Sequence, residues 1–435
     1  MAQLTEGFRN CFPEAGAIHA YIEWAHKLTH APPEMHLASI VPAVAYELCR
    51  RGFKLSAYGP PRAWFAVVGP PAAGKTSTVN RAKRFTQDFY SRVGPTLELK
   101  PWMSLEGSMA GVIHALAERT DAQSGVTAAV LFHNEFSKVL RSDDSIEVLN
   151  ELYDGSDYER HYRHLQQAAA AGDDKAKPTI RDVQMNAVVT TTPRALQRVI
   201  KPEMVEGGLY TRFLWLRTHL RPEDLMPRPL HDHLGRAKAL GVWEMWWRAL
   251  ELHRHQGGQR EIVFDSAADD WLVETVWEGL RDVLTRDTYE AGVAMRVNAY
   301  ATSLAAIYAG SRGNFYDGEL HVELDDTVRA ANLVIRCYSD ALTLGGPLST
   351  VGLDISDKAK LVLAAVERAG RTGCSRRDLY QALNRHATRG ELAEIVDTLA
   401  EMELVVEVVS TVGAQGGRPG RRVYGAGYAP GVSQA

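Results

Sequence analysis

The sequence predicts an α/β protein built on a wound, mostly parallel β-sheet. Through the first half of the chain, short and almost wholly apolar runs alternate with amphipathic helical patterns, as parallel strands and their crossover helices do. A glycine-containing turn closes the first of these runs, at the place where ligands bind in such sheets. The C-terminal part has a different rhythm, with three helical patterns followed by a β-hairpin.

Shifts in composition divide the chain into four expected segments. Apolar residues at helical spacing fill the first segment, and the apolar runs of the sheet fill the second. A proline-rich stretch then leads into a tryptophan-bearing helical segment, and a glycine-rich stretch precedes the last one. We expect an N-terminal helical segment (1–60), a sheet-containing core (61–225), a helical domain (226–347) and a winged helix (355–428).

The strands of the core are expected where apolar runs end at glycine, proline or polar residues. A helix is expected from Lys75 to about Tyr90, and a second in the stretch "SMAGVIHALAERT". The five expected strands cover residues 62–69, 96–104, 126–136, 181–193 and 210–220.

Composition limits the classes of function. The 435 residues exceed one ordinary core, and the net charge of -4 means that any contact with nucleic acid must use local basic patches. The four cysteines form no C-x-x-C pair, which argues against a zinc knuckle and suits a reducing cytosol. No apolar run reaches membrane-spanning length, so we expect a cytoplasmic protein without a membrane partner.

The stretch "GPPAAGKT" matches the phosphate-binding pattern G-x-x-x-x-G-K-[ST] without a mismatch. Its glycines let successive backbone N–H groups turn toward phosphate oxygens, and the next helix adds its positive N-terminal end. We expect Lys75 to reach the β- and γ-phosphates of ATP and the Thr76 hydroxyl to bind Mg²⁺. The expected nucleotide-binding residues are Gly69, Pro70, Ala72, Ala73, Gly74, Lys75, Thr76 and Ser77.

Hydrolysis needs an acidic group at the end of a neighbouring strand, and "VLFHNEF" supplies Glu135 to polarise the attacking water. The preceding position, where an aspartate usually holds magnesium through water, is Asn134, which can accept a hydrogen bond but adds no charge. In "AVVTTTP", Thr190 and Thr191 are candidates for sensing the γ-phosphate, and we select Thr191. A capping role for Glu135 and a plain threonine-rich turn are the alternatives.

Arg212 lies in "EGGLYTRFLWL", at the start of an otherwise apolar run. A buried arginine needs a partner, either a structural carboxylate or the γ-phosphate held by a neighbouring subunit. The second alternative predicts an arginine finger in trans. The order of phosphate loop, acidic strand, polar strand tip and arginine is that of ring-forming P-loop NTPases of the RecA/AAA-like kind, so we expect a homo-oligomer, a hexamer.

The chain resembles the helicase/primase-like P-loop ATPases of phages, prophages and plasmids, once classed as a domain of unknown function. The resemblance covers most of residues 12–220, and its motifs are the P-loop, "GSMAGVIHAL", "LFHNEFSKVL", "LNELYDG", "VVTTTPRAL" and "GGLYTRFLWL". It implies a RecA/AAA-like fold with a C-terminal winged helix, and a role as a replication ATPase or helicase of a mobile element.

DNA contacts are expected in two places. The stretch between the acidic and polar strands interleaves Arg160 and Arg163 with tyrosines, which suits single-stranded DNA in a ring pore. The loop of the C-terminal hairpin carries Arg418, Arg421 and Arg422, which suits duplex phosphates. A solvated insertion and a protein-contact module are the respective alternatives, and acidic residues in the third helix weigh against DNA.

Three functions follow from these expectations. The first is an ATP-hydrolysing, ring-forming DNA motor, and the second is a regulatory ATPase switch, such as a helicase loader or an anti-phage defence ATPase, that does not unwind DNA. The third is a DNA-binding regulator without hydrolysis, which the intact Lys75, Thr76 and Glu135 argue against.

Overall fold

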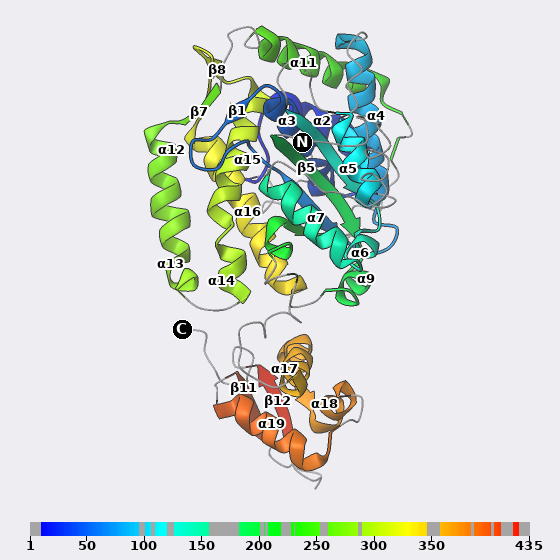
Figure 1. The fold of residues 1–435 in the computed structure, drawn as a ribbon, viewed down its shortest axis with the longest axis vertical. Helices are drawn as coiled ribbons and strands as arrows, with labels where there is room; N and C mark the ends of the chain where they lie inside the picture. Colours follow the sequence, from blue (N-terminus) through cyan, green and yellow to red (C-terminus); the bar gives the residue numbers. More distant parts are fainter. Residues whose placement is uncertain are drawn as a thin grey trace, which may run out of the picture.

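The computed structural model places most of the chain, and its elements are drawn in Figure 1. The residues that it describes are 10–94, 101–105, 109–119, 126–155, 182–200, 204, 208–218, 228–229, 231–252, 260–285, 289–345, 357–383, 387–401, 404–409 and 421–425.

The core of the described chain is a five-stranded sheet in the order β3-β4-β5-β2-β6, and all of its pairings are parallel. This confirms the α/β fold with a wound parallel sheet that the alternating patterns predict. Each strand is shorter than its apolar run, because the runs include the loops at the strand ends. The strands are β2 (Trp64–Val68), β3 (Trp102–Ser104), β4 (Thr127–His133), β5 (Val183–Thr191) and β6 (Leu214–Arg217).

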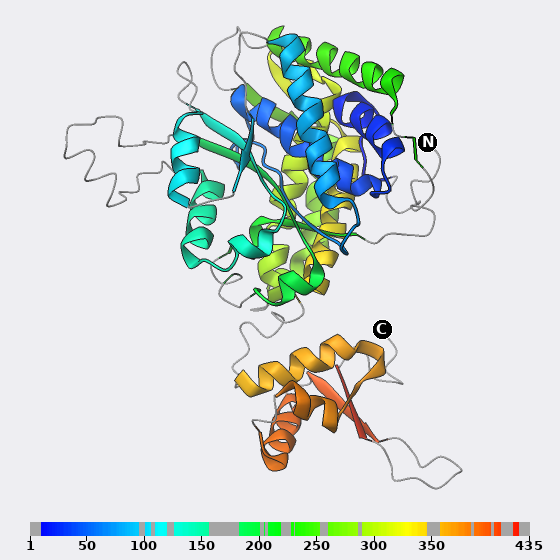
Figure 2. The same ribbon diagram turned by 90° about the vertical axis from the view of Figure 1, so that its right-hand side faces the viewer.

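Helices cover both faces of this sheet (Figure 2). The long helix α3 packs with α4 over one face, and α5 packs with α7 over the other. Right-handed crossovers produce this division, because the chain runs from β2 to the far edge at β3 and then returns strand by strand. The helices of this part are α4 (Lys75–Val93), α5 (Met109–Ala117), α6 (Phe136–Val139), α7 (Asp143–Asp154), α9 (Pro193–Gln197) and η3 (Tyr210–Arg212).

The N-terminal segment is built around a central buried helix rather than a surface one. Every residue of α3 except its last is buried, because it contacts both the sheet and the helices C-terminal to it. Its Pro33 occupies the first helical turn, where the missing N–H costs nothing. The elements are α2 (Gly16–Ala25), η1 (His26–Leu28), α3 (Pro33–Arg50) and the short strand β1 (Phe53–Lys54).

The segment expected to be a helical domain also contains strands. In the described residues, β7, β8 and β9 form a second sheet with β1 in the order β1-β7-β9-β8. Asp317 and Gly318, both at positive φ, form the two-residue turn between β8 and β9. The elements are α11 (His233–Leu252), β7 (Arg260–Phe264), α12 (Ser266–Trp271), the π-helical η6 (Leu272–Trp277), α13 (Glu278–Leu284), α14 (Tyr289–Ala294), α15 (Val297–Arg312), β8 (Phe315–Tyr316), β9 (Glu319–Val322) and α16 (Leu324–Leu344).

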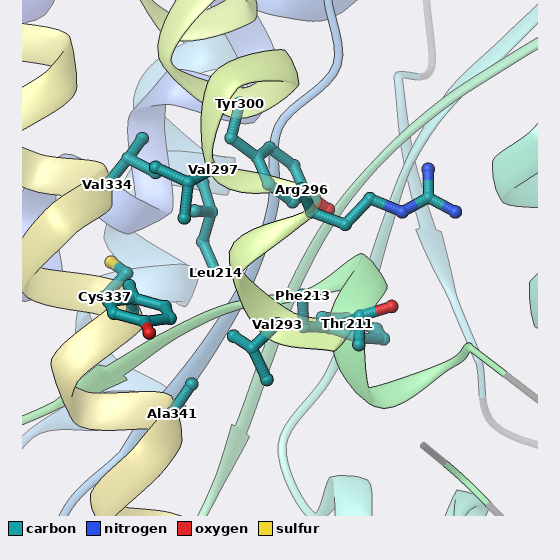
Figure 3. A pocket seen from close by; sticks show the side chains of 11 residues that line it. Thr211, Phe213, Leu214, Val293, Arg296, Val297, Tyr300, Val334, Cys337 and Ala341 are labelled. Carbon is teal, nitrogen blue, oxygen red and sulfur yellow. The ribbon is translucent and has the colours of Figure 1, made fainter. Parts of the chain in front are cut away.

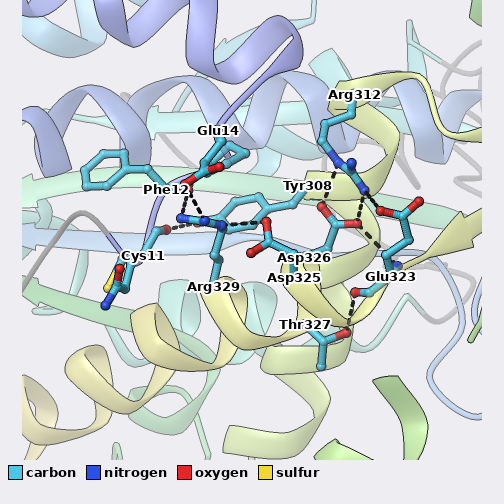
Figure 4. A network of polar contacts seen from close by, with 12 residues as sticks. Cys11, Phe12, Glu14, Tyr308, Arg312, Glu323, Asp325, Asp326, Thr327 and Arg329 are labelled. Carbon is cyan, nitrogen blue, oxygen red and sulfur yellow. Dashed lines mark hydrogen bonds and ion pairs between the residues drawn. The ribbon is translucent and has the colours of Figure 1, made fainter. Parts of the chain in front are cut away.

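One hydrophobic core joins these parts, since its buried side chains run from Cys11 to Leu344. Polar contacts reinforce the junction of the N-terminal segment with α16 (Figure 4). Arg329 on α16 binds Asp325 at 2.7 Å and reaches Glu14 at 2.6 Å. The start of the described chain, at Glu14, is thereby tied to a helix that lies more than 300 positions later.

The C-terminal residues form a unit with its own core. Its sheet is antiparallel in the order β10-β12-β11, so a short strand before α18 adds to the three helices and the hairpin that the sequence predicts. The elements are α17 (Asp357–Ala369), η8 (Gly370–Thr372), β10 (Cys374–Ser375), α18 (Arg376–Ala382), α19 (Arg389–Glu401), β11 (Val405–Val409) and β12 (Arg421–Gly425).

Candidate nucleotide-binding site

The predicted phosphate loop joins the carboxyl end of β2 to the first residue of α4. Ala72 and Gly74 adopt left-handed backbone conformations, with φ of 64° and 83°. Gly74 is the N-cap residue and offers no side-chain acceptor, so the first N–H groups of α4 are left without a side-chain cap. A helix start of this kind, following a tight turn, suits the binding of a phosphate.

Two glycines of the loop are also required by packing. A Cβ at Gly69 would lie 2.5 Å from Oγ1 of Thr218, the residue after β6. A Cβ at Gly74 would lie 3.0 Å from the Cβ of Ala31, which precedes α3. The loop therefore fits between the end of β6 and the N-terminal segment.

Lys75 is the first residue of α4, and its ammonium group turns back onto the loop. Nζ donates to the carbonyl oxygens of Gly69 at 2.8 Å and Pro70 at 2.6 Å. Burial of this side chain lowers the pKa of Lys75. To bind a nucleotide phosphate, the ammonium group must exchange these two carbonyls for phosphate oxygens, which are stronger acceptors.

The other predicted loop residues surround this lysine. Thr76 and Ser77 are exposed in the first turn of α4, and Ser77 Oγ donates to the Gly74 carbonyl at 2.7 Å. Ala73 is buried, whereas Pro70 is half-buried and Ala72 is exposed. The exposed Thr76 hydroxyl is thus accessible to a metal ion, as its predicted role requires.

Two polar side chains next to the loop have buried atoms without a hydrogen-bond partner in the described structure. Thr191 ends β5, is 4% exposed, and lies opposite Val68 in the sheet register. Its Oγ1 has no partner, and neither has Oδ1 of Asn134, which follows β4. Thr190, by contrast, donates its Oγ1 proton to the Asn134 carbonyl at 2.8 Å.

Unpaired buried polar atoms cost free energy, and a bound ligand that supplies their partners removes this cost. Both atoms belong to the carboxyl ends of neighbouring strands, β5 next to β2 and its phosphate loop, and β4 on the other side of β5. The chain also leaves β2 and β5 in opposite directions, toward β3 and β6, which opens a crevice at their carboxyl ends. Together with the Thr76 hydroxyl, these two oxygen atoms are suited to contact a nucleotide phosphate and a magnesium ion that is held through water.

Glu135 is the N-cap residue of α6, its side chain makes no capping hydrogen bond, and that side chain is 61% exposed. Its carboxylate forms an ion pair with Lys138 on the next turn, and this hydrogen bond lowers the pKa of Glu135. The carboxylate is ionised, as a group that polarises water must be, but it is held by a lysine and must turn away from it to reach a nucleotide.

Arg212 lies at the amino-terminal ends of the strands, whereas the loop lies at their carboxyl ends. It is the last residue of η3 and precedes β6, whose Leu214 is level with Phe65 near the start of β2. The loop starts at Gly69, four residues beyond Phe65, so roughly 13 Å of strand separates it from the level of Leu214 at about 3.3 Å per residue, and Arg212 precedes Leu214. Arg212 is therefore remote from the phosphate loop of its own chain.

Arg212 is 9% exposed and is held by a carboxylate of α7. Its Nε lies 3.3 Å from Oδ1 of Asp154, and its Nη2 lies 3.0 Å and 2.8 Å from the two carboxylate oxygens. This is the structural ion pair that the sequence leaves open as an alternative. It does not decide whether Arg212 also acts on a neighbouring subunit, which stays a prediction.

The predicted DNA contacts are only partly within the described residues, since Arg160, Arg163 and Arg418 lie outside them. Arg421 is 3.5 Å from Glu407 of the adjacent strand. Arg422 donates to the backbone carbonyls of Thr372 and Gly373. Both arginines thus already have acceptors within the C-terminal unit.

Sequence reasoning missed Thr218 and Asp154. Thr218 contacts the loop from β6, and Asp154 pairs with Arg212 from 58 positions away. Thr218 belongs to no motif, and Asp154 lies in the motif "LNELYDG" without a role assigned to it. Each contact depends on which elements are neighbours in the fold. For Thr218, the sequence signal is its place at the end of an apolar run. For Asp154, the signal is that Arg212 lies in an apolar run that contains no acidic residue.

Among the described residues, no group of three or more histidines, cysteines or acids could hold a metal ion, and no helix is both long and apolar enough to cross a bilayer.

Comparison with known proteins gives limited information. No protein-family model and no curated protein matches the chain. One solved structure with partial likeness is the ORC1 protein of Aeropyrum pernix in complex with DNA, with 13% identity, 89% of this chain and 88% of that chain covered, and a TM-score of 0.23. Another is the SCCmec type IV Cch active helicase, with 10% identity, 98% and 71% covered, and a TM-score of 0.37. At these TM-scores neither likeness bears on the function of this chain.

Proposed function

We propose that this chain binds and hydrolyses ATP with Mg²⁺ and works as a ring-forming motor on DNA. One observation supports the ATPase most strongly. Two buried polar atoms have no partner in the described structure: Oγ1 of Thr191, which ends the strand next to β2 and its phosphate loop, and Oδ1 of Asn134, which follows the next strand, β4. A site that leaves such atoms unpaired gives up stability, and a bound nucleotide with its metal and water supplies the missing partners.

Each residue then has a defined part in hydrolysis. The N–H groups of the loop and of the α4 N-terminus hold the phosphates. The ammonium group of Lys75 exchanges its hydrogen bonds to the loop carbonyls for hydrogen bonds to the β- and γ-phosphates. Thr76 would hold Mg²⁺ through its exposed hydroxyl, and the metal would offset negative charge on the phosphates. Glu135 leaves Lys138 to polarise the attacking water, and Thr191 orients that water from the tip of β5.

Assembly into a ring, a hexamer in our proposal, would complete the site. Arg212 lies at the amino-terminal edge of the sheet, far from the loop of its own chain. A closed, head-to-tail ring brings unlike surfaces of neighbouring subunits together. In such a ring the amino-terminal edge of one sheet can face the nucleotide of the next, and Arg212 can stabilise the charge that develops on the transferred phosphoryl group.

DNA is the proposed substrate of the motor. The C-terminal unit has the order of helices and strands of a winged helix, and its strand β12 begins with Arg421 and Arg422. Exchange of the Arg421 contact with Glu407 for a DNA phosphate is inexpensive, because the arginine is exposed and the two groups are 3.5 Å apart. Binding that uses such contacts weakens steeply with salt.

A regulatory ATPase switch is the second candidate, and two observations favour it. Asn134 adds no charge for magnesium, and Glu135 and Lys75 are both held by groups of their own chain. Such a site suits slow turnover, with ATP controlling assembly as in a helicase loader or a defence ATPase.

Strand displacement on a forked duplex distinguishes the two candidates. A motor releases the labelled strand when ATP is present, and its Lys75→Ala variant does not. A switch hydrolyses ATP, loses hydrolysis on the same substitution, and displaces no strand under any condition. Displacement by the Lys75→Ala variant at the wild-type rate would contradict both.

A further inference from the structure

Three arginines surround one buried tyrosine at the amino-terminal edge of the main sheet. The guanidinium carbons of Arg62, Arg212 and Arg296 lie 5.4, 5.6 and 5.5 Å from the ring centroid of Tyr153. Cation–π attraction to a single ring stabilises this gathering only in part, because like charges repel at these distances. A cluster of this kind is expected where an anion binds.

The three guanidinium groups differ in the hydrogen bonds that they make. Arg62 donates to the backbone carbonyls of Tyr153 and Asp154 at the end of α7, and Arg212 donates to the Asp154 carboxylate. The backbone of Arg296 is hydrogen-bonded to Val293 and Tyr300, but its guanidinium group makes no hydrogen bond and no ion pair with any residue in the described part of the chain. Its side chain leads away from the apolar residues that line the neighbouring pocket (Figure 3). Arg296 is therefore the guanidinium of this cluster with donors to spare.

The backbone holds Arg296 and Arg212 in a fixed relation. Arg296 is the N-cap residue of α15, and Tyr300 in the first turn of that helix donates its hydroxyl proton to the Arg212 carbonyl. Tyr300 is fully buried, so this link is shielded from water. The two arginines thus present their guanidinium groups from η3 and α15 to the same tyrosine.

Their place in the sheet excludes the nucleotide of their own chain. Arg62 precedes β2 and Arg212 precedes β6, whereas the phosphate loop follows β2. Gly155, beside Arg62, lies against the carbonyl of Val183 at the start of β5. The cluster therefore belongs to the amino ends of three neighbouring strands, and an anion that it binds must come from another molecule.

We propose that Arg296 is a second arginine acting in trans, which with Arg212 contacts the terminal phosphate of the ATP bound by the neighbouring subunit. This inference rests on the proposed ATPase and its ring assembly. Arg212 is hydrogen-bonded to Asp154, so the guanidinium group with unused donors is that of Arg296. Both guanidinium groups pack against the ring of Tyr153. Two guanidinium groups match the charge of a γ-phosphoryl group better than one.

A mixing experiment tests the proposal. Arg296→Ala has an intact phosphate loop but no arginine to donate, and Lys75→Ala has the arginine but no working loop. We expect Arg296→Ala alone to lose at least about 100-fold in kcat, as removal of a donor to transition-state charge does. Its affinity for a fluorescent ATP analogue should remain within about twofold of wild type, since its own loop is unchanged.

An equimolar mixture of the two variants should regain activity. If subunits mix at random, about one quarter of the interfaces join an intact loop to an intact arginine, so about one quarter of the wild-type rate is expected. Arg281→Ala is the matched control, because Arg281 is exposed on α13 and pairs only with Glu278 among the described residues. This control should retain the wild-type rate. Analytical ultracentrifugation with ATP confirms that each variant assembles.

The outcomes are distinguishable. A mixture no more active than its two components, with assembly intact, would overturn the trans role of Arg296. Loss of single-stranded DNA binding in Arg296→Ala without ATP, and no recovery on mixing, would instead assign the cluster to a DNA phosphate and also overturn it. In both cases hydrolysis by wild type and its loss in Lys75→Ala would leave the proposed ATPase intact. A wild-type protein that hydrolyses no ATP would contradict the proposed function itself.

Discussion

Two adjacent threonines at the end of β5 should respond in opposite ways to the same substitution. Thr191 has a buried Oγ1 without a partner, whereas the Oγ1 of Thr190 donates to the Asn134 carbonyl at 2.8 Å. Replacement by valine changes the shape of either side chain little and removes only the hydroxyl. Thr191→Val should stabilise the protein, and Thr190→Val should destabilise it.

The magnitudes follow from the two environments. An unpaired buried hydroxyl costs about 1–3 kcal/mol, so its removal at Thr191 should raise the free energy of unfolding by about 1 kcal/mol or more. Loss of the hydrogen bond at Thr190 costs about 0.5–1.5 kcal/mol and leaves a carbonyl unsatisfied, so about 1–2 kcal/mol should be lost. The two variants should therefore differ by about 2–4 kcal/mol.

Urea unfolding followed by tryptophan fluorescence measures this difference. All nine tryptophans lie between residues 24 and 277, so the signal reports on the part of the chain that contains β5. ATP hydrolysis is measured on the same samples. Thr191→Val should lose at least about tenfold in kcat while it gains stability, because its hydroxyl is kept for the attacking water. A Thr191→Val protein that is less stable than wild type, or that keeps the full kcat, would refute this reasoning.

Two further predictions concern the loop and the C-terminal unit. Gly69→Ala places a Cβ 2.5 Å from Thr218 Oγ1, so it should destabilise the protein by about 1–3 kcal/mol. Thr218→Ala removes that atom and should restore most of the loss in the double variant, and additive effects in urea unfolding would contradict the contact. Glu391 accepts hydrogen bonds from the Thr388 N–H and from Lys358, which lower its pKa from 4.5 to about 2. A lowered carboxyl pKa stabilises the fold above pH 4.5, and this contribution is lost as the pH falls toward 2. Hydrogen exchange in α19, corrected for intrinsic rates, should therefore increase over this range in wild type but not in Glu391→Gln.

Local patterns were sufficient to predict the main sheet and its loop. The apolar runs of β2 and β4 are buried on both faces, so they form nearly continuous hydrophobic stretches in the sequence. The start of α4 at Lys75 agrees with the sequence prediction, because the spacing of the loop glycines and Lys75 has a mechanical cause. Thr191 was selected from two threonines, and the structure distinguishes them through the partner of Thr190.

Contacts between distant parts of the chain could not be predicted in this way. Strand β7 pairs with β1, which lies some 200 positions earlier in the sequence. The five residues of β7 have a mixed polar and apolar pattern, so their strand signal is weak compared with the helical patterns on either side. The Asp317-Gly318 pair is itself a hairpin signal, but it lies in a segment whose other patterns are helical. Arg296 belongs to no motif, and only the position of Tyr153 brings it to Arg212.

ATP hydrolysis with and without single-stranded DNA tests the central claim most directly. We predict that the wild-type protein hydrolyses ATP in the presence of Mg²⁺, that single-stranded DNA raises its kcat, and that Lys75→Ala abolishes both the basal and the stimulated rates. Undiminished hydrolysis by Lys75→Ala would contradict the account, since no other group in the described structure replaces that ammonium at the phosphate loop.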